Sequence, residues 1–222
     1  MRAILIANGE LNHLPVDLRV DDYLIAVDGG ASHYLRIGLN PDVVLGDFDS
    51  LPERDRIHLI NNEVEVIAFP ARKDEIDLEL GLFHALERGA SEVHIYAALG
   101  GRWDMTIANM CLLSHPKFSA LEMHIIDGPQ EIRILRGGEQ MILEGEIGDT
   151  VSLIPLQEDA HGITTNGLEY PLKGGTLRLG ATKGISNQLN FLRGAVSLEK
   201  GALLVVVIHQ PEHFDHKNEV EP

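Results

Sequence analysis

The sequence predicts an α/β protein in two parts: an open, mostly parallel, Rossmann-like sheet with helices, followed by a small all-β sandwich. Up to residue 131, short apolar runs alternate with polar or glycine-rich turns and with segments of helical spacing. This pattern is typical of parallel strands joined by helices. From residue 132 to 210 the apolar runs become short and alternating, and turn signals such as Asn166-Gly167 separate them, which is typical of an antiparallel sandwich.

Each expected strand of the first part is a short apolar run, and most of these runs end at a glycine, an aspartate or an asparagine. Such residues favour turns, so they mark where a strand stops. In chain order, the expected strands are residues 3–7, 23–27, 41–45, 64–68, 93–98 and 121–126.

Segments with the apolar spacing of helices separate these strands. The first is expected to end at Gly38 and the third at Gly89, because glycine commonly follows the last turn of a helix. Ser50 is expected to cap the second helix, with Glu53 three residues later completing a capping box. The expected helices are residues 31–37, 52–60, 74 or 76 to 87, and 106–113.

Composition and charge exclude several classes of partner. The 222 residues are 44% hydrophobic and carry a formal net charge of −16, whereas nucleic-acid binding needs clustered Lys and Arg. An acidic protein can bind a polyphosphate only if a metal ion screens the charge. We expect no membrane partner, because no apolar run approaches membrane-spanning length. No signal peptide is visible, and a single cysteine, Cys111, cannot form an internal disulfide, which fits the reducing cytoplasm. Cys111 is expected to lie in the core, within a helix.

Two aspartates directly follow the third expected strand. Gly46 allows a sharp turn, and Asp47 and Asp49 then flank Phe48. In extended backbone the two carboxylates would face one spot, and Phe48 would face the core. Carboxylates held together repel unless a cation lies between them, and Mg²⁺ is a hard ion that prefers oxygen ligands. The alternative is a solvated acidic turn.

More charge lies at the start of the third expected helix, in Lys73-Asp74-Glu75-Ile76-Asp77. Asp74 and Asp77 are three residues apart and share one face of a helix. We expect Asp74 or Asp77 to complete a magnesium site, and either of them is a candidate proton acceptor. Lys73 is expected to interact with a phosphate as a point charge. The alternative is that these acids only stabilise the helix dipole.

Two glycine-rich turns also follow strands, Asp28-Gly29-Gly30 and Gly100-Gly101-Arg102-Trp103-Asp104. Glycines let a ligand approach the backbone, and Arg102 offers a planar fork to phosphate oxygens. The alternatives are a helix-capping Asp28, a surface pair of Arg102 with Asp104, and a Trp103 in the core. Because ligands of open α/β sheets bind at the carboxyl ends of the strands, we expect these turns to converge.

A loop of the second part, Thr182-Lys183-Gly184-Ile185-Ser186-Asn187, combines hydroxyl groups, an amide and a glycine. Such groups suit the recognition of a polar heterocycle. The alternative is a plain connection between strands. The histidines are scattered, and we assign them no role.

Taken together, these motifs resemble those of thiamine pyrophosphokinases, in order and spacing, from residue 1 to about residue 210. The resemblance rests on Asp28-Gly29-Gly30, Gly46-Asp47-Phe48-Asp49-Ser50, Lys73-Asp74-x-x-Asp77, Gly100-Gly101-Arg102-x-Asp104 and Gly184-Ile185-Ser186-Asn187. Two positions depart from the family pattern: Ile76 stands where Thr is usual, and Met105 where His is common.

The resemblance implies Mg²⁺-dependent transfer of the pyrophosphoryl group of ATP to the hydroxyethyl oxygen of thiamine, giving thiamine diphosphate and AMP. It implies an ATP-binding catalytic domain at 1–131, a thiamine-binding sandwich at 132–210 and a polar tail at 211–222. It also implies a homodimer whose active sites lie between subunits.

The same resemblance assigns roles to residues. The catalytic residues are expected to be Asp47, Asp49, Asp74, Asp77 and Arg102, and the first three of these are the expected magnesium ligands. ATP would be bound by Asp28, Gly29, Gly30, Lys73, Gly100, Gly101, Arg102 and Asp104. Thiamine would be bound by Thr182, Gly184, Ser186 and Asn187.

Two other functions stay open at this point. A D-x-D nucleotide-sugar transferase would also use paired aspartates and a divalent metal, but it would not release AMP from ATP. A non-catalytic regulator that binds thiamine or a nucleotide would bind its ligand without turnover.

Overall fold

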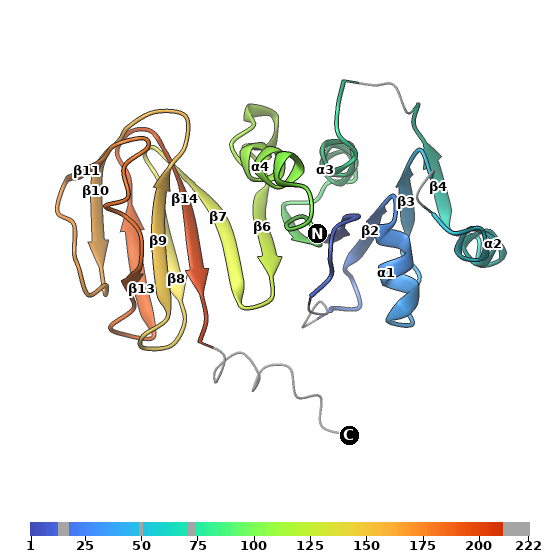
Figure 1. The fold of residues 1–222 in the computed structure, drawn as a ribbon, viewed down its shortest axis with the longest axis horizontal. Helices are drawn as coiled ribbons and strands as arrows, with labels where there is room; N and C mark the ends of the chain where they lie inside the picture. Colours follow the sequence, from blue (N-terminus) through green and yellow to red (C-terminus); the bar gives the residue numbers. More distant parts are fainter. Residues whose placement is uncertain (13–17, 49–50, 71–73, 211–222) are drawn as a thin grey trace. The chain divides into compact units, whose positions relative to one another are not determined.

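The structure is a computed structural model that describes residues 1–12, 18–48, 51–70 and 74–210. The chain divides into two compact units, Met1–Gly128 and Pro129–Pro222. The first has a parallel sheet with helices and the second has antiparallel sheets, so the predicted fold class is confirmed (Figure 1). The tail expected at 211–222 lies outside the described residues.

The first unit is built on a parallel sheet with the strand order β6-β5-β1-β2-β3-β4. The chain runs outward from β1 to β4 and then returns to the other side of β1 with β5, so the strand order reverses between β1 and β5. Ligands of open α/β sheets bind in the crevice at such a point. The strands are β1 (Arg2–Ile6), β2 (Tyr23–Val27), β3 (Val43–Gly46), β4 (Glu65–Ala68), β5 (Glu92–Tyr96) and β6 (Glu122–Asp127).

Helices connect these strands, close to where the sequence predicts them. They are α1 (Gly30–Arg36), α2 (Glu53–Asn61), α3 (Asp77–Glu87), α4 (Trp103–Leu112) and the short 3₁₀ helix η1 (Pro116–Phe118). Gly81 lets α3 lie close to the sheet, because a Cβ there would be 2.8 Å from Leu5 Cδ1 and 2.9 Å from Val27 Cγ2. No helix in the described part of the chain is both long and apolar enough to cross a bilayer.

Two local expectations and one of the alternatives are wrong. The N-cap residue of α2 is Pro52 rather than the expected Ser50, which itself lies outside the described residues. Helix α4 begins at Trp103, which is 77% exposed, so the alternative that placed this residue in the core is wrong. Cys111 is exposed on the same helix. Helical spacing locates a helix but does not say which face meets the sheet.

The second unit contains two antiparallel sheets, with the orders β12-β9-β14-β7 and β11-β10-β13-β8. Leu143 and Val196 from one sheet share a buried core with Val151, Leu203 and Val205 from the other, so the two sheets form a sandwich. The strands are β7 (Gln130–Arg136), β8 (Gln140–Glu144), β9 (Thr150–Pro155), β10 (Ala160–Asn166), β11 (Gly175–Leu177), β12 (Asn187–Gln188), β13 (Arg193–Ser197) and β14 (Ala202–Ile208).

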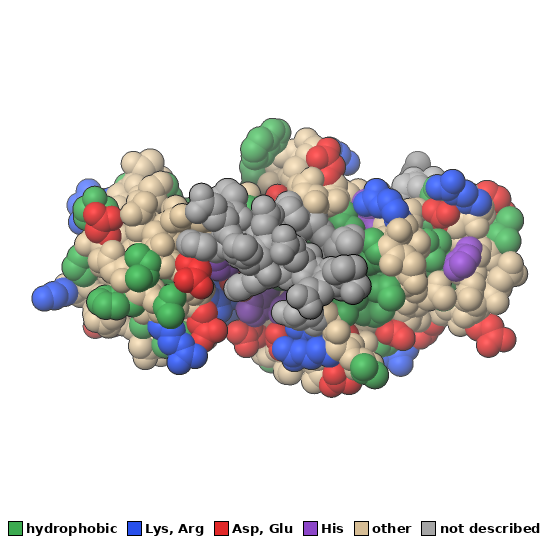
Figure 2. All heavy atoms as spheres, turned by 90° about the horizontal axis from the view of Figure 1, so that it is seen from below, with side chains coloured by type: hydrophobic (Ala, Val, Ile, Leu, Met, Phe, Trp, Pro, Cys, Tyr) green, Lys and Arg blue, Asp and Glu red, His purple; other side chains and the backbone are tan. Residues whose placement is uncertain are grey.

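The surface reflects the acidic composition. On the face shown in Figure 2, Lys and Arg side chains stand among acidic ones and do not form a continuous basic stripe.

Ile76 occupies the N-cap position of α3, with φ −75°, ψ 156° and no side-chain cap hydrogen bond. A threonine hydroxyl in this extended conformation would accept a hydrogen bond from the first turn. We expect Ile76→Thr to raise the free energy of unfolding by about 1 kcal/mol, measured by urea denaturation. Ile76→Val keeps the β-branch without the hydroxyl and is the matched control. Equal stabilities of the two variants would show that the missing cap is unimportant.

Candidate active site

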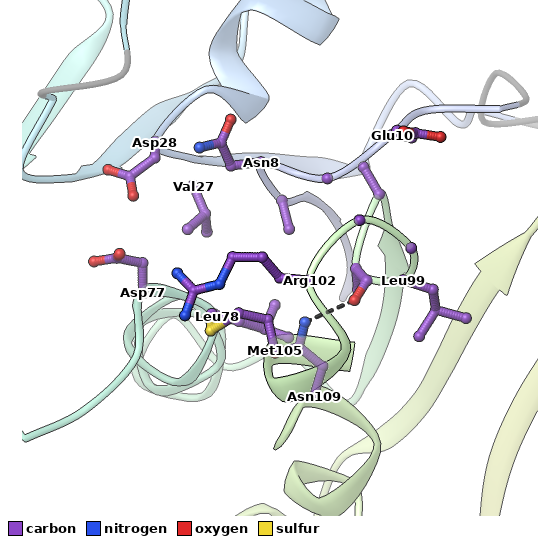
Figure 3. A pocket seen from close by; sticks show the side chains of 16 residues that line it. Asn8, Glu10, Val27, Asp28, Asp77, Leu78, Leu99, Arg102, Met105 and Asn109 are labelled. Atoms are coloured by element: carbon purple, nitrogen blue, oxygen red, sulfur yellow. Dashed lines mark hydrogen bonds between the residues drawn. The ribbon is translucent and has the colours of Figure 1, made fainter. Parts of the chain in front are cut away.

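A cavity of about 450 Å³ opens at the carboxyl edge of the parallel sheet, where β1 and β5 are neighbours (Figure 3). Its walls are the turns after β1, β2 and β5 together with the starts of α3 and α4. Five residues expected from the sequence line it, namely Asp28, Asp77, Gly100, Gly101 and Arg102. The cavity therefore occupies the point where the strand order reverses, as the fold class predicts.

Three carboxyl groups interact beside this cavity. Asp28 follows β2, Asp47 follows β3, and Asp77 is the first residue of α3. The Asp47 N–H donates to Asp28 Oδ1 at 3.2 Å, and the Asp28 carboxyl group is hydrogen-bonded to that of Asp77. Burial, the hydrogen bond to Asp77 and the negative charges of Asp77 and Asp47 together raise the pKa of Asp28 to about 7.

Gly46 makes this arrangement possible. Its φ is +152°, and a Cβ at this position would lie 1.7 Å from Asp28 Oδ1. Three residues near the site that are not glycine also have positive φ: +49° at Asp28, +61° at Phe48 and +53° at Ala97. Each such residue costs about 1 kcal/mol, less for an aspartate. Strain of this kind concentrates at functional sites, where the surrounding fold holds it in place.

The pair Asp47 and Asp49 is only partly described. Asp49 lies outside the described residues. The premise that these side chains alternate along an extended backbone is wrong, because Phe48 has a left-handed conformation. Phe48 nevertheless packs against the buried cluster that includes Val44 and Leu59, as predicted.

The acids at the start of α3 separate in the structure. Asp77 lines the cavity, whereas Asp74 lies on an exposed bend before the helix and is not among the lining residues. Lys73 lies outside the described residues. The helix begins at Asp77, so Asp74 and Asp77 do not share a helical face.

Arg102 belongs to the cavity and also to an ion pair. It is the N-cap residue of α4, and its guanidinium group donates to Asp104, at 3.2 Å from Nε to Oδ1 and 2.5 Å from Nη2 to Oδ2. In Figure 3 the guanidinium group is directed toward the side of the cavity where Asp28 and Asp77 lie. The side chain of Arg102 is 74% exposed, so the pair with Asp104 can exchange for a ligand anion at little cost.

Gly29 and Gly30 serve packing rather than lining the cavity. A Cβ on Gly29 would lie 1.9 Å from Asn8 Oδ1, and one on Gly30 would lie 2.0 Å from Ile6 O. These glycines let α1 approach the end of β1.

The lining residues that were not chosen as site residues from the sequence include Asn8, Glu10, Met105 and Asn109. Asn109 is buried, and its Nδ2 donates to Ala98 O at 2.7 Å, while its Oδ1 has no hydrogen-bond partner among the described residues. Asn8 lies two residues after the end of β1, so the rule that selected Asp28 would also have selected Asn8. Asn109 lies inside a helix and carries no such signal.

In the second unit, the loop expected to bind thiamine is exposed at Thr182 and Ser186. Ser186 has φ +60°, and its N–H donates to Ser152 Oγ at 3.0 Å. The Asn187 amide is occupied, since it accepts from Tyr170 N–H at 3.0 Å and donates to Tyr170 O at 2.8 Å. Gly184 packs on β9, where its carbonyl accepts from Leu153 N–H at 2.8 Å.

Known protein families match both units. The catalytic domain of thiamin pyrophosphokinase matches residues 18–125, and its vitamin B1 binding domain matches residues 139–203. Thiamine pyrophosphokinase from Bacillus subtilis (strain 168) is 34% identical over 206 residues, covering 91% of this chain and 96% of that protein. The chain belongs to the thiamine pyrophosphokinase family.

Solved structures of the thiamine pyrophosphokinase family share the fold. The crystal structure of the Bacillus subtilis protein has a TM-score of 0.85 at 30% identity and covers 95% of this chain and 100% of its own. That of the Geobacillus thermodenitrificans protein has a TM-score of 0.83 at 29% identity and covers 96% and 100%. The resemblance predicted from the motifs is thereby confirmed.

The donor set suits the Mg²⁺ expected for a thiamine pyrophosphokinase. Asp28, Asp47 and Asp77 supply only carboxylate oxygens, the ligands that Mg²⁺ prefers. Burial and the repulsion from Asp77 and Asp47 favour a proton on Asp28 and raise its pKa to about 7. A divalent cation would relieve the same repulsion by replacing that proton.

The raised pKa of Asp28 makes stability depend on pH. Between its ordinary value of 3.8 and about 7, the folded chain holds a proton that the unfolded chain has lost. The free energy of unfolding therefore falls as pH rises through this window. Asn suits both the shape and the positive φ, so Asp28→Asn should be about 1–3 kcal/mol more stable than wild type at pH 8 and nearly equal to it at pH 4.

Urea denaturation in EDTA at the two pH values measures this difference. Asp21→Asn, at an exposed position before β2, is the matched control and should have nearly the stability of wild type at both pH values. The same stability difference at both pH values would contradict the burial of a shared proton.

Proposed function

We propose that the chain transfers the pyrophosphoryl group of ATP to the hydroxyethyl oxygen of thiamine and releases AMP, with Mg²⁺ bound. The observation that carries this proposal is the cluster of Asp28, Asp47 and Asp77 beside Arg102 at the cavity. It lies in the unit that matches the catalytic domain of the family. Membership of the family and the geometry of this site thus support the same reaction.

The aspartates of the site would bind Mg²⁺, and one of them could accept a proton. Asp47 and Asp77, with Asp28, would hold Mg²⁺, and Asp49 and Asp74 remain proposed ligands. Bound Mg²⁺ would screen the negative charge of the triphosphate and polarise its oxygens. Asp77 is the better candidate for a proton acceptor than Asp74, because Asp77 lines the cavity. Phosphoryl transfer depends mainly on positioning and charge, so no strong base is required.

The basic and polar groups would hold the two substrates. Arg102 would donate bidentate hydrogen bonds to phosphate oxygens, and Lys73 would add a positive point charge. Gly100 and Gly101 have φ of +83° and +62°, and a Cβ on either would meet no atom within 4 Å, so a phosphate can approach their backbone. The 132–210 sandwich would bind thiamine, while the 1–131 part would bind ATP.

The wider proposal includes a homodimer with active sites between subunits, acting in the cytoplasm. The free Cys111 fits a reducing compartment. Sedimentation combined with activity tests the assembly. A fully active monomer would contradict shared active sites.

Asp47→Asn is the direct test of the activity. Purified protein with ATP, Mg²⁺ and thiamine should form AMP and thiamine diphosphate in equal amounts. Loss of a carboxylate at the site of developing charge should lower turnover at least 100-fold in Asp47→Asn, and likewise in Asp49→Asn. Asp21→Asn is the control and should keep full activity. Near wild-type rates for Asp47→Asn at saturating Mg²⁺ would show that Asp47 is not a metal ligand. If wild type bound its ligands without turnover, the protein would instead be a regulator.

Ser186 and Asn187 should respond differently to truncation. Ser186→Ala removes an exposed hydroxyl that is available to thiamine, and we expect the KM for thiamine to rise about tenfold, or roughly 1.4 kcal/mol. Asn187→Ala removes the hydrogen bonds to Tyr170 and should mainly lower the melting temperature. Ser119→Ala, at an exposed position of the first unit, is the control. An unchanged thiamine KM in a well-folded Ser186→Ala variant would place thiamine elsewhere.

A further inference from the structure

A second cluster of titratable side chains lies in the first unit, on strands β5 and β6. Glu92 and His94 belong to β5, and Glu122 and His124 belong to β6. The parallel register pairs Glu92 with Glu122 and His94 with His124. Residues two apart in a strand project from the same face, so these four side chains form a square array on one face of the sheet.

Short distances connect the array. His94 Nε2 lies 2.8 Å from Glu92 Oε1, and His124 Nε2 lies 3.4 Å from Glu122 Oε1. The two imidazole rings are 4.8 Å apart between centroids. In the described part of the chain, one group of three possible ligands converges closely: atoms of Glu92, His94 and His124 all lie within 4.8 Å of one another. Tetrahedral zinc with 2.0–2.1 Å bonds would place its ligand atoms about 3.4 Å apart, so the required closure is small.

Three of the four side chains in the array are buried or half-buried, as in a binding site rather than a solvated surface patch. His124 is 9% exposed, Glu92 and His94 are half-buried, and the Glu122 side chain remains 66% exposed. Burial lowers the pKa of His94, and the neighbouring His124 lowers it further. Arg2 on the next strand brings a positive charge, but it is paired with Asp22 at 2.6 Å.

We propose that Glu92, His94 and His124 bind a divalent transition-metal ion, with Glu122 as a fourth ligand on the solvent side. Two imidazole nitrogens with carboxylate oxygens suit zinc or cobalt, whereas magnesium prefers oxygen alone. Such an ion would tie β5 to β6.

This site is separate from the candidate active site. Glu92 and Glu122 are the first residues of their strands, and the cavity lies where β5 ends. His94 precedes the cavity residue Ala97 by three residues, a rise of about 10 Å along a strand. The proposal therefore does not depend on the proposed function.

Isothermal titration with ZnCl₂ on the full chain tests the site. Wild type and Asp47→Asn should each bind zinc at this site, because Asp47 belongs to the active-site cluster. His94→Gln combined with His124→Gln should weaken that zinc binding at least 30-fold, and Glu92→Gln about tenfold. A variant with His213→Gln and His216→Gln is the control for histidine number and should bind as wild type does. Co²⁺ added to wild type should give the visible absorption of a tetrahedral site, and this should be lost in the double variant.

Circular dichroism establishes that each variant is folded, and Glu92→Gln, which keeps both rings, answers the question even if the double variant does not fold. Wild-type zinc affinity in Glu92→Gln would overturn the proposal. So would zinc binding that is lost in Asp47→Asn or in the control for histidine number. Absence of zinc binding by wild type would show instead two independent His–Glu pairs on a sheet face.

Discussion

The ends of β2 and β3 meet so closely at Gly46 that no side chain has room there, because the Asp28 carboxyl group lies where a Cβ would stand. From this contact follow the hydrogen bond from Asp47 N–H to Asp28 and the approach of Asp77 at the start of α3. The parallel order of the strands brings the turns after β1 and β5 to the same edge. The cavity, its acids and its arginine are thus consequences of how a few strands end.

Such an arrangement favours ligand binding over stability. Three acids at one edge repel, and the left-handed backbone at Phe48 and Ala97 adds strain. The surrounding core, with strand residues such as Ile4, Ile25 and Val44 fully buried, holds the site in this state. A cation that binds the folded chain recovers part of the lost stability by mass action. Natural sites commonly combine local destabilisation with function in this way.

Much of this could be predicted from the sequence. Apolar runs located every strand of the parallel sheet, and the rule that ligands bind after strands selected Asp28, Asp47 and Arg102. Features that depend on tertiary contacts could not be predicted. The exposure of Trp103 and Cys111 depends on which face of α4 meets the sheet.

The same limit applies to the sites. The left-handed turn at Phe48 lies next to the contact between Gly46 and Asp28, which brings together segments distant in sequence. The pairing of His94 with His124 depends on the register of two strands about thirty residues apart, which no local pattern encodes.

The central claim is that Asp28 shares a proton with its acidic neighbours until a cation replaces it. Calorimetric titration of the protein with Mg²⁺, in buffers of different ionisation enthalpy, counts the protons released on binding. The pKa of about 7 for Asp28 predicts release of about one proton per Mg²⁺ at pH 6, almost none at pH 9, and none at either pH in Asp28→Asn. Mg²⁺ binding at pH 6 without proton release would contradict this account of the site.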